Sequence, residues 1–239
     1  MELSIVAVVI DQLSRTQRFV SSIRDNTKEN YELIIIDNGS KDKKTIKYLK
    51  ENSDVYYRFE KITDLSKAWN KGIELSKGKY VLIANNDTVV PPNWFQPMKE
   101  VFEKKKNVGM VYPLTNGSVL RYNFKIGRIK SLSKPFKIPR WRQGVWGEFN
   151  LFTRKVLKDV GGYCEDYKQA SAEDLDMLYT LYSKNYAVYV QPKVFVFHEG
   201  SITGDAIFSK SEKNKRWNKN YLQFVKKWEK YEDYIRGKK

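Results

Sequence analysis

Tyr80–Thr88 reads Tyr-Val-Leu-Ile-Ala-Asn-Asn-Asp-Thr: five mostly apolar residues run directly into two amides, a carboxylate and a hydroxyl. An apolar run of this length is typical of a strand that is buried on both faces, as in a parallel sheet. The polar cluster then lies at the carboxyl end of the strand, where open α/β sheets bind ligands. Asp87 is therefore a candidate oxygen ligand for a divalent cation, although Asn and Asp are also ordinary turn residues.

Strand-like and helix-like segments alternate on both sides of this stretch, which predicts a doubly wound, mostly parallel sheet. The other expected strands are Leu3–Ile10, Glu32–Ile36, Val55–Phe59, Gly109–Pro113, Gly144–Phe152 and Ala187–Phe197. Helices are expected at Arg18–Asn26, Thr45–Glu51, from Asp64 or Ser66 to Gly78, at Pro92–Lys106, from Thr153 to Gly161, and at Glu173–Lys184.

The composition describes a basic protein with a substantial core. The chain has 239 residues, 44 basic and 28 acidic, for a net charge of +16. Such an excess favours phosphate-bearing substrates, nucleic acid or an anionic membrane face, although a lysine-rich solvated surface has the same charge. The single cysteine, Cys164, excludes an intrachain disulfide and a cysteine-based zinc cluster. With no signal-like N-terminus and no 18-residue apolar run, we expect a cytoplasmic protein, and peripheral membrane contact stays open.

Two basic segments stand apart from the alternating pattern. Arg121–Arg142 holds eight basic residues and no acidic one, which favours a long loop with some irregular strand. From about Ser209, aromatic and aliphatic residues recur at spacings of three and four against a lysine-rich face. This pattern predicts one or two amphipathic helices, packed either on their own domain or on an anionic membrane or partner.

Polar groups stand at or next to several strand ends, and they occur within a series of short motifs. The series is Val9-Ile10-Asp11-Gln12-Leu13-Ser14-Arg15, Ile36-Asp37-Asn38-Gly39-Ser40, Asn70-Lys71-Gly72-Ile73, Asn85-Asn86-Asp87, Gly161-Gly162-Tyr163, Glu173-Asp174-Leu175-Asp176 and the late His198. In order and spacing, the series resembles the family 2 glycosyltransferases of the GT-A fold, over roughly residues 3–203. The resemblance implies an α/β GT-A domain at residues 1–205, with a nucleotide-binding half at 1–113 and an acceptor-binding half at 114–205. Residues 206–239 would form a basic amphipathic helical extension.

The resemblance implies an inverting transfer of a sugar from a UDP- or dTDP-sugar, with Mn²⁺ or Mg²⁺ as cofactor. Asp87 matches the last residue of the family's metal-binding motif, and His198 matches a second metal or phosphate ligand. A metal ion offsets the charge that grows on the diphosphate as the glycosidic bond breaks. Asp37 matches the aspartate that accepts a hydrogen bond from the base. The remaining nucleotide-site candidates are Asp11, Leu13, Lys67 and Asn86.

Asp174 is the expected general base, because an inverting transferase needs one carboxylate to accept the proton of the acceptor hydroxyl. It lies at the start of an expected helix, whose dipole favours the ionised form, and acidic first turns are also common without any catalytic role. Glu173 would orient Asp174 or touch the acceptor. Glu148 and Trp146 are further candidates for the acceptor or sugar site, and Trp146 is equally suited to core packing.

This chain departs from the family pattern at three places. Asp11-Gln12-Leu13-Ser14 replaces the usual Pro-Thr-Tyr-Asn, Asn85 replaces the first carboxylate of the metal motif, and Cys164 replaces a frequent aspartate. We therefore expect a metal site that relies on one carboxylate, the donor diphosphate and His198.

Two alternatives stay open beside a glycan or lipid-linked acceptor. The basic segment and the net charge also suit DNA that carries hydroxymethylated bases, although no motif for reading base edges is present. The second alternative is a non-catalytic protein that binds nucleic acid or a membrane and has a decayed transferase fold. The weakened metal motif supports it.

Overall fold

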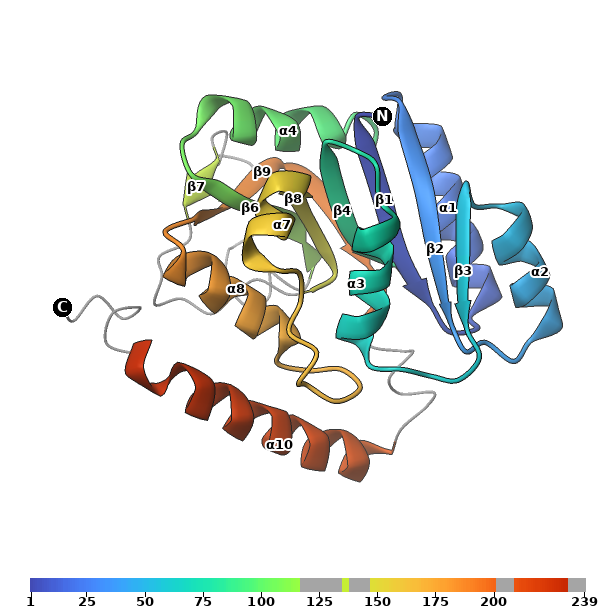
Figure 1. Cartoon of the computed structure of the whole chain (residues 1–239). Helices are drawn as coiled ribbons and strands as arrows, with labels where there is room; N and C mark the ends of the chain where they lie inside the picture. Colours follow the sequence, from blue (N-terminus) through green and yellow to red (C-terminus); the bar gives the residue numbers. More distant parts are fainter. Residues whose placement is uncertain (117–134, 138–146, 201–208, 232–239) are drawn as a thin grey trace.

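The computed structural model describes residues 1–116, 135–137, 147–200 and 209–231, and Figure 1 shows their arrangement. The strands are β1 (Leu3–Val9), β2 (Tyr31–Asn38), β3 (Val55–Phe59), β4 (Tyr80–Asn85), β5 (Thr88–Val89), β6 (Val108–Thr115), β7 (Phe136–Lys137), β8 (Phe149–Thr153) and β9 (Ala187–His198). The helices are α1 (Leu13–Asn26), α2 (Lys43–Glu51), α3 (Leu65–Leu75), α4 (Phe95–Lys104), α7 (Arg154–Val160), α8 (Glu173–Ser183) and α10 (Lys210–Trp228). A 3₁₀ turn, η1 (Glu229–Tyr231), follows them.

A single mixed sheet forms the centre, in the strand order β3-β2-β1-β4-β8-β6-β9-β5, with β7 paired to β9. The first four strands are parallel, which confirms the doubly wound N-terminal half. Strand β8 then inserts antiparallel between β4 and β6. The carboxyl ends of β1, β2 and β4 therefore meet at one edge of the sheet, beside the start of β8.

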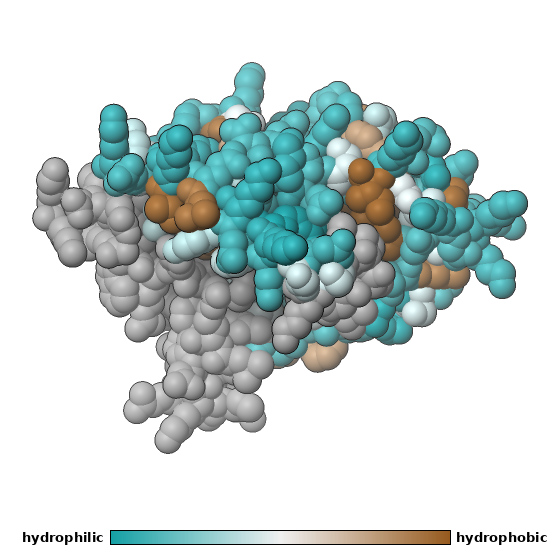
Figure 2. Space-filling view, turned by 90° about the horizontal axis from the view of Figure 1, so that it is seen from below, coloured by the Kyte–Doolittle hydropathy of each residue, from teal (hydrophilic) through white to brown (hydrophobic). Residues whose placement is uncertain are grey.

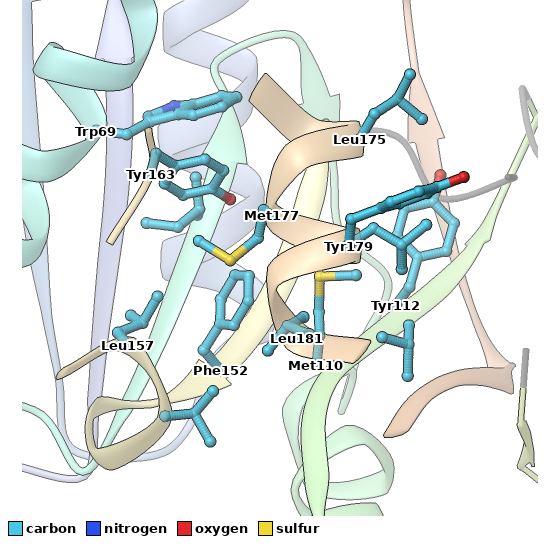
Figure 3. Packing of buried hydrophobic residues seen from close by; sticks show 14 of the residues in the cluster. Trp69, Met110, Tyr112, Phe152, Leu157, Tyr163, Leu175, Met177, Tyr179 and Leu181 are labelled. Carbon is cyan, nitrogen blue, oxygen red and sulfur yellow. The ribbon is translucent and has the colours of Figure 1, made fainter. Parts of the chain in front are cut away.

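Both faces of the parallel half are buried, as the apolar runs predict. In β1, Val6 faces a core shared with α3, α7, α8 and α10, while its neighbours Ile5 and Ala7 face a second core under α1 and α4. Figure 3 shows the first core around α8, where Met177 and Leu181 pack with Phe152 and Met110. Gly72 allows α3 to approach the sheet closely, because a Cβ there would lie 2.1 Å from Cγ1 of Val6.

Several element boundaries differ from the predicted ones. Helix α1 begins at Leu13 rather than Arg18, because its first turn is polar and lacks the apolar periodicity that marks a helix. The strand expected at Gly144–Phe152 is β8, at Phe149–Thr153. Asp64 occupies the N-cap position of α3, but its side chain makes no capping hydrogen bond. The basic segment at 121–142 lies outside the described residues except for its part within 135–137.

Helix α10 packs against its own domain, along the lower side of α8 in Figure 1. It begins with a capping box between Ser209 and Glu212. Phe224 and Trp228 are buried against Tyr179 of α8, with ring centroids 4.8 Å and 5.6 Å apart. Burial of two such side chains contributes several kcal/mol, by the usual about 1.5 to 3 kcal/mol each. Among the described helices, none has the length and apolar character needed to span a bilayer.

Candidate active site

A cavity of about 360 Å³ opens where the carboxyl end of β4 faces the start of α8. Its walls come from six parts of the chain that are distant in sequence. The lining residues are Leu65, Trp69, Asn85, Asn116, Gly147, Glu148, Glu173, His198, Glu199 and Gly200. Three of the predicted site residues, Glu148, Glu173 and His198, thus share one cavity.

Asp87 and His198 meet beside this cavity, as the metal-site prediction requires. Oδ1 of Asp87 lies 3.1 Å from Nε2 of His198. Beyond this short approach, neither buried atom has a hydrogen-bond partner among the described residues. Two adjacent ligands of an octahedral divalent cation are also about 3 Å apart. The pair therefore fits a shared metal ion.

Backbone contacts fix the relative position of the two side chains. Strands β5 and β9 pair antiparallel, which places Thr88 opposite His198. The amide of Asn116 donates to the carbonyl oxygen of His198 and accepts from its backbone N–H, both at 2.8 Å. These contacts hold the backbone of His198 in place and leave Nε2 of the ring beside Asp87.

The charges around His198 favour a cation. Burial lowers the pKa of the imidazole, but the hydrogen bond and charge of Asp87, with the charges of Glu148 and Glu199, raise it above its ordinary value overall. The same negative charges attract a divalent cation, and protons compete with that cation for His198. In the described part of the chain no group of three or more His, Cys, Asp or Glu side chains forms a metal cage. Asp87 and His198 as metal ligands therefore stay a prediction, and a cation held by these two side chains would need further ligand oxygens from a bound substrate.

Glu173 and Asp174 occupy the first turn of α8, and Glu173 lines the same cavity as His198. Burial and the charge of Asp174 raise the pKa of Glu173 to about 8, although the backbone N–H of Ser171 donates to its carboxylate. Asp174 accepts a hydrogen bond from the backbone N–H of Leu175 at 2.8 Å. A Cβ added at Gly147 would lie 3.6 Å from the Cβ of Asp174 and 3.0 Å from the Trp69 ring. The absence of a side chain at Gly147 therefore allows its backbone to approach Trp69 and Asp174 closely.

Glu148 is buried at the end of the cavity nearer β6. Its carboxylate accepts hydrogen bonds from the hydroxyl groups of Tyr112 and Thr115. Its backbone carbonyl accepts from the N–H of Asn85, which joins the start of β8 to the end of β4. This places Glu148 as a fixed acceptor that faces any ligand in the cavity.

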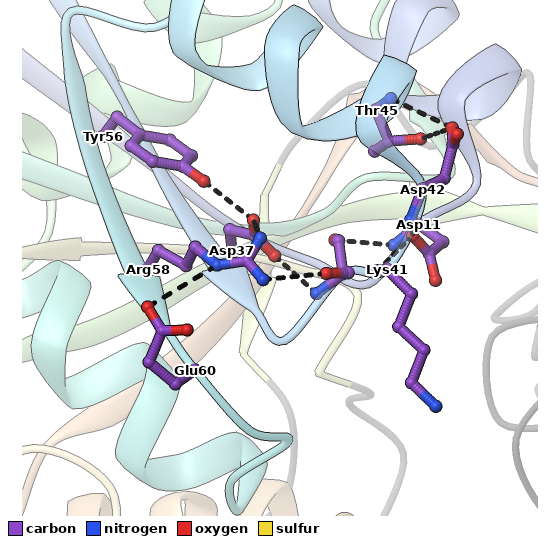
Figure 4. A network of polar contacts seen from close by, with 9 residues as sticks. Asp11, Asp37, Lys41, Asp42, Thr45, Tyr56, Arg58 and Glu60 are labelled. Atoms are coloured by element: carbon purple, nitrogen blue, oxygen red, sulfur yellow. Dashed lines mark hydrogen bonds and ion pairs between the residues drawn. The ribbon is translucent and has the colours of Figure 1, made fainter.

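Asp37 lies outside this cavity, in the network shown in Figure 4. Its carboxylate is fully buried and accepts hydrogen bonds from Ser40 N at 2.8 Å, Tyr56 Oη at 2.8 Å and Arg58 Nη1 at 2.9 Å. Burial, followed by the hydrogen bond and charge of Asp37, raises the pKa of Tyr56 to about 12. Direct contact with a nucleotide base stays a prediction, and it would require one of these groups to move.

Asp11 joins the loop after β1 to the loop after β2. Its Oδ1 accepts from the backbone N–H groups of Lys41 and Asp42, both at 2.9 Å, and its own N–H donates to Ser40 (Figure 4). Asp11 and Gln12 both have positive φ, 51° and 61°, which turns the chain sharply before α1. In the structure Asp11 therefore shapes the loops of the predicted nucleotide pocket.

The other nucleotide candidates are spread over the same edge. Asn86 is buried and donates to the hydroxyl of Thr16 at 2.9 Å, Leu13 is half-buried at the start of α1, and Lys67 is exposed on α3. None of the three lines the cavity. Trp146 lies outside the described residues, so its assignment stays a prediction.

Sequence reasoning missed Asn116, Glu199 and Trp69, all of which line the cavity. Glu199 forms ion pairs with Arg15 and Arg18 of α1, which hold its pKa below the usual range. The side chain of Trp69 packs on Tyr163, with ring centroids 4.7 Å apart (Figure 3). Of these three residues, only Glu199 could have been suspected from the sequence, because it directly follows His198.

Comparison with known structures agrees with this architecture. Crystallised GalNAc-T7 with UDP, GalNAc and Mn²⁺ has a TM-score of 0.73 and 18% identity, over 98% of this chain and 50% of that one. The mannosyltransferase PcManGT from Pyrobaculum calidifontis, in complex with GDP-Man and Mn²⁺, has a TM-score of 0.71 and 13% identity, over 99% of this chain and 68% of that one. The fold is thus the GT-A glycosyltransferase fold.

Sequence comparison identifies the family. The uncharacterized glycosyltransferase YkcC of Bacillus subtilis (strain 168) is 29% identical over 142 residues, 48% of this chain and 43% of its own length. An uncharacterized glycosyltransferase of Rickettsia bellii (strain RML369-C) is 30% identical over 88 residues, 36% of this chain and 13% of its own length. The chain thus spans less than half of these curated relatives. The profile described as "Glycosyl transferase family 2" matches residues 4–161, more than half of the chain, and the protein belongs to this family.

Proposed function

We propose that this protein is an inverting, metal-dependent glycosyltransferase that moves a sugar from a UDP- or dTDP-sugar to an acceptor hydroxyl. The observation that carries the proposal is the cavity between β4 and α8. It is lined by His198, whose imidazole adjoins Asp87, and by Glu173, which precedes Asp174 in the first turn of α8. Transfer from a diphosphate donor to a hydroxyl requires cation ligands and a carboxylate base at one site.

Asp87 and His198 would hold Mn²⁺ or Mg²⁺, with the donor diphosphate supplying further ligands. When bound, the metal ion neutralises the negative charge that develops on the departing diphosphate. The nucleotide would lie over the loops after β1 and β2, where Asp11, Leu13, Asp37, Lys67 and Asn86 are the candidate contacts. Because the metal pair has only one carboxylate, we expect metal and donor to bind together.

Asp174 would act as general base. Its carboxylate accepts the acceptor's proton while the acceptor oxygen bonds to the anomeric carbon. The bond from that carbon to the phosphate oxygen breaks at the same time, and the nucleoside diphosphate leaves with the bonding electron pair. Attack from the side opposite the leaving group inverts the configuration. Glu148 and Glu173, both buried at the cavity, would accept hydrogen bonds from sugar or acceptor hydroxyls.

The test is transfer or hydrolysis of nucleotide sugars by the wild type and two variants. A thermal-shift panel with Mn²⁺ or Mg²⁺ first identifies the donor, because a bound ligand stabilises the folded state by mass action. Asp174→Asn is expected to abolish transfer while it retains donor binding, and Asp87→Ala to lower metal-dependent donor binding. Asp159→Asn, an exposed carboxylate change on α7, is the control. Full activity of Asp174→Asn and Asp87→Ala would contradict the proposal.

For the acceptor, the exposed side of α10 favours one attached to an anionic membrane. Lys215, Lys219 and Lys226 point to solvent there, and Leu222 and Val225 are 69% and 42% exposed. Figure 2 views the molecule from this side and shows a mostly hydrophilic surface with separate hydrophobic patches. Lysines beside exposed aliphatic side chains suit a lipid headgroup region, whereas aliphatic side chains gain little from a phosphate backbone.

Co-sedimentation with vesicles tests this part. We expect binding to phosphatidylglycerol vesicles that is weaker for a Lys219→Glu/Lys226→Glu variant and absent with phosphatidylcholine. Salt-sensitive binding to duplex DNA without vesicle binding would instead favour the DNA acceptor. A folded protein that binds no nucleotide sugar in the presence of Mn²⁺ would favour the non-catalytic alternative.

A further inference from the structure

The loop between α7 and α8 reaches the proposed catalytic turn through a strained backbone. Gln169, Ser171 and Ala172 have φ angles of 64°, 112° and 68°, in a region that side chains other than glycine rarely adopt. Ala172 is the N-cap residue of α8, so Glu173 and Asp174 follow it directly. Such a conformation persists only where neighbouring groups hold it in place.

Asn220 of α10 is the group that holds the second half of this loop. It is 1% exposed. Its Nδ2 donates to the carbonyl oxygens of Lys168 and Ser171 at 3.0 Å and 3.2 Å and lies 3.2 Å from Oγ of Ser171, while its Oδ1 accepts from Lys168 N at 3.4 Å. One side chain that comes from outside the loop thus contacts both ends of the strained segment.

The other side of the loop is held by the start of α3. Asp64 accepts from the backbone N–H of Gln169, and Leu65 N donates to the carbonyl oxygen of Gln169. This explains why Asp64, although at the N-cap position, does not cap α3. The loop is therefore clamped between α3, whose Leu65 lines the cavity, and α10.

Further hydrogen bonds connect the loop and α10 to the carboxylates of α8. Ser171, held by Asn220 through its carbonyl and hydroxyl oxygens, donates its own N–H to Glu173. One turn into α8, the buried Asp176 accepts hydrogen bonds from Tyr167 Oη and Trp228 Nε1, at 2.9 Å and 2.7 Å. Lys227 completes this contact, with its Nζ 2.8 Å from Oδ1 of Asp176. Helix α10 therefore contacts the chain on both sides of Glu173 and Asp174.

We infer that Asn220 is a positioning residue for sugar transfer: through Ser171 it sets the orientation of the Glu173-Asp174 turn towards the cavity. Asn220 does not line the cavity, so it acts through the loop and not on the substrate. The inference rests on the proposed function for its effect on rate, but its structural part stands on the hydrogen bonds alone. It assigns α10 a role in the active site, in addition to that of an attached surface helix.

The test compares Asn220→Ala with Phe224→Leu in the full-length protein. Both changes loosen the α10 contact, but Phe224 packs on Tyr179 of α8, and its ring has no polar atom that could hydrogen-bond to the strained loop. We expect Asn220→Ala to lower kcat by about 10- to 100-fold with the KM for the nucleotide sugar within about twofold, because donor contacts lie at the other side of the cavity. Phe224→Leu is expected to lower Tm and to keep kcat at temperatures where it is folded.

Hydrogen exchange supplies a readout that needs no activity. The amides of Lys168 and Ser171 are expected to exchange at least tenfold faster in Asn220→Ala than in the wild type, with β1 and β4 amides unchanged. Unchanged loop exchange, or an equal loss of kcat in Phe224→Leu, would overturn the inference. If Asn220→Ala does not fold, Asn220→Asp replaces it, because it keeps the size and loses the donors. A wild type that transfers no sugar refutes the proposed function, and the exchange result still decides whether Asn220 holds the loop.

Discussion

Asp37 lies near the end of β2 and Asp87 just after β4, the two strands that flank β1, yet their carboxylates have different surroundings. Asp37 is fully buried and accepts three hydrogen bonds, one of them from the cation of Arg58. Asp87 is 7% exposed and faces only the imidazole of His198 at its Oδ1. Asp37 thus has three of a carboxylate's roughly four acceptor positions filled by its own chain, whereas among the described residues Oδ1 of Asp87 has only the imidazole beside it.

This difference separates a structural role from a ligand-binding role in a way that strand position alone does not. A buried carboxylate with three donors stabilises the fold, and removal of Asp37 leaves the partly buried Arg58 without its 2.9 Å partner. Asp87 adjoins only the imidazole of His198 at Oδ1 among the described residues, so we expect its removal to cost the fold less. The two residues are therefore expected to respond to mutation in opposite ways.

Asp37→Ala should have the largest effect on stability. We expect the free energy of unfolding to fall by about 3 kcal/mol, near the low end for a broken buried pair because Arg58 remains a quarter exposed. Urea unfolding measures the loss, and Asp87→Ala is the matched comparison, with a smaller expected loss because His198, unlike Arg58, is a cation only when it is protonated. Equal losses in the two variants would contradict the comparison.

Asp87→Ala should have the larger effect on activity. We expect kcat/KM to fall by about 100-fold, or about 2.7 kcal/mol, because the metal ion loses its only protein carboxylate. The measurement is the rate of transfer as a function of Mn²⁺ concentration. A variant that reaches the wild-type rate at the wild-type metal concentration would show that Asp87 does not bind the metal.

Glu173 is a third buried carboxylate, and burial together with the negative charge of Asp174 dominates its surroundings. Its pKa is raised from 4.5 to about 8, so between those pH values the folded state holds a proton that the unfolded state releases. The proton bound to Glu173 in the folded state therefore stabilises the fold. This stabilisation is fully present below pH 4.5 and is lost as the pH rises through 8. Relative to Glu173→Gln, the wild type should therefore lose on the order of 4 kcal/mol of stability across this window, at about 1.4 kcal/mol for each pH unit. Urea unfolding of both proteins at pH 5 and pH 8.5 measures it, and a constant difference would contradict the raised pKa.

Asn85→Asp should have the smallest of these effects, and it changes the affinity of the proposed metal site beside Asp87. Asn85 lines the cavity, and a second carboxylate there would offer the cation another charged oxygen. We expect the Mn²⁺ concentration for half-maximal donor binding to fall about three- to tenfold, or about 1 kcal/mol. Calorimetry with a nucleotide sugar present measures it. Weaker metal binding would indicate that the Asn85 side chain serves another function.

The alternation of strands and helices could be predicted because it depends on local periodicity. The apolar runs at β1, β2 and β4 are buried on both faces, and the residues after them lie at one edge, as predicted. The start of α1 and the insertion of β8 could not be predicted in the same way. The first has a polar turn, and the second is antiparallel through contacts with β4 and β6 that no local pattern encodes.

The site was predictable in its residue types and less so in its contacts. Asp87 and His198 were expected to meet, and they do, because β5 and β9 pair in register. The donors around Asp37 were not expected, since Tyr56 and Arg58 belong to an edge strand whose register with β2 decides which side chains reach the carboxylate. The role of Asn220 had no signal in the sequence, where it is one asparagine in a lysine-rich helix.

The sequence by itself thus determined the α/β class, the family and which carboxylates stand at strand and helix ends, because periodicity and short motifs are local properties of the chain. Only the tertiary structure decided which hydrogen-bond partners surround each of those carboxylates. Hydrogen-bond satisfaction depends on side chains that arrive from distant elements, and their arrival is set by strand register and helix docking. Asp37 and Asp87 are alike in sequence, and their neighbours distinguish them.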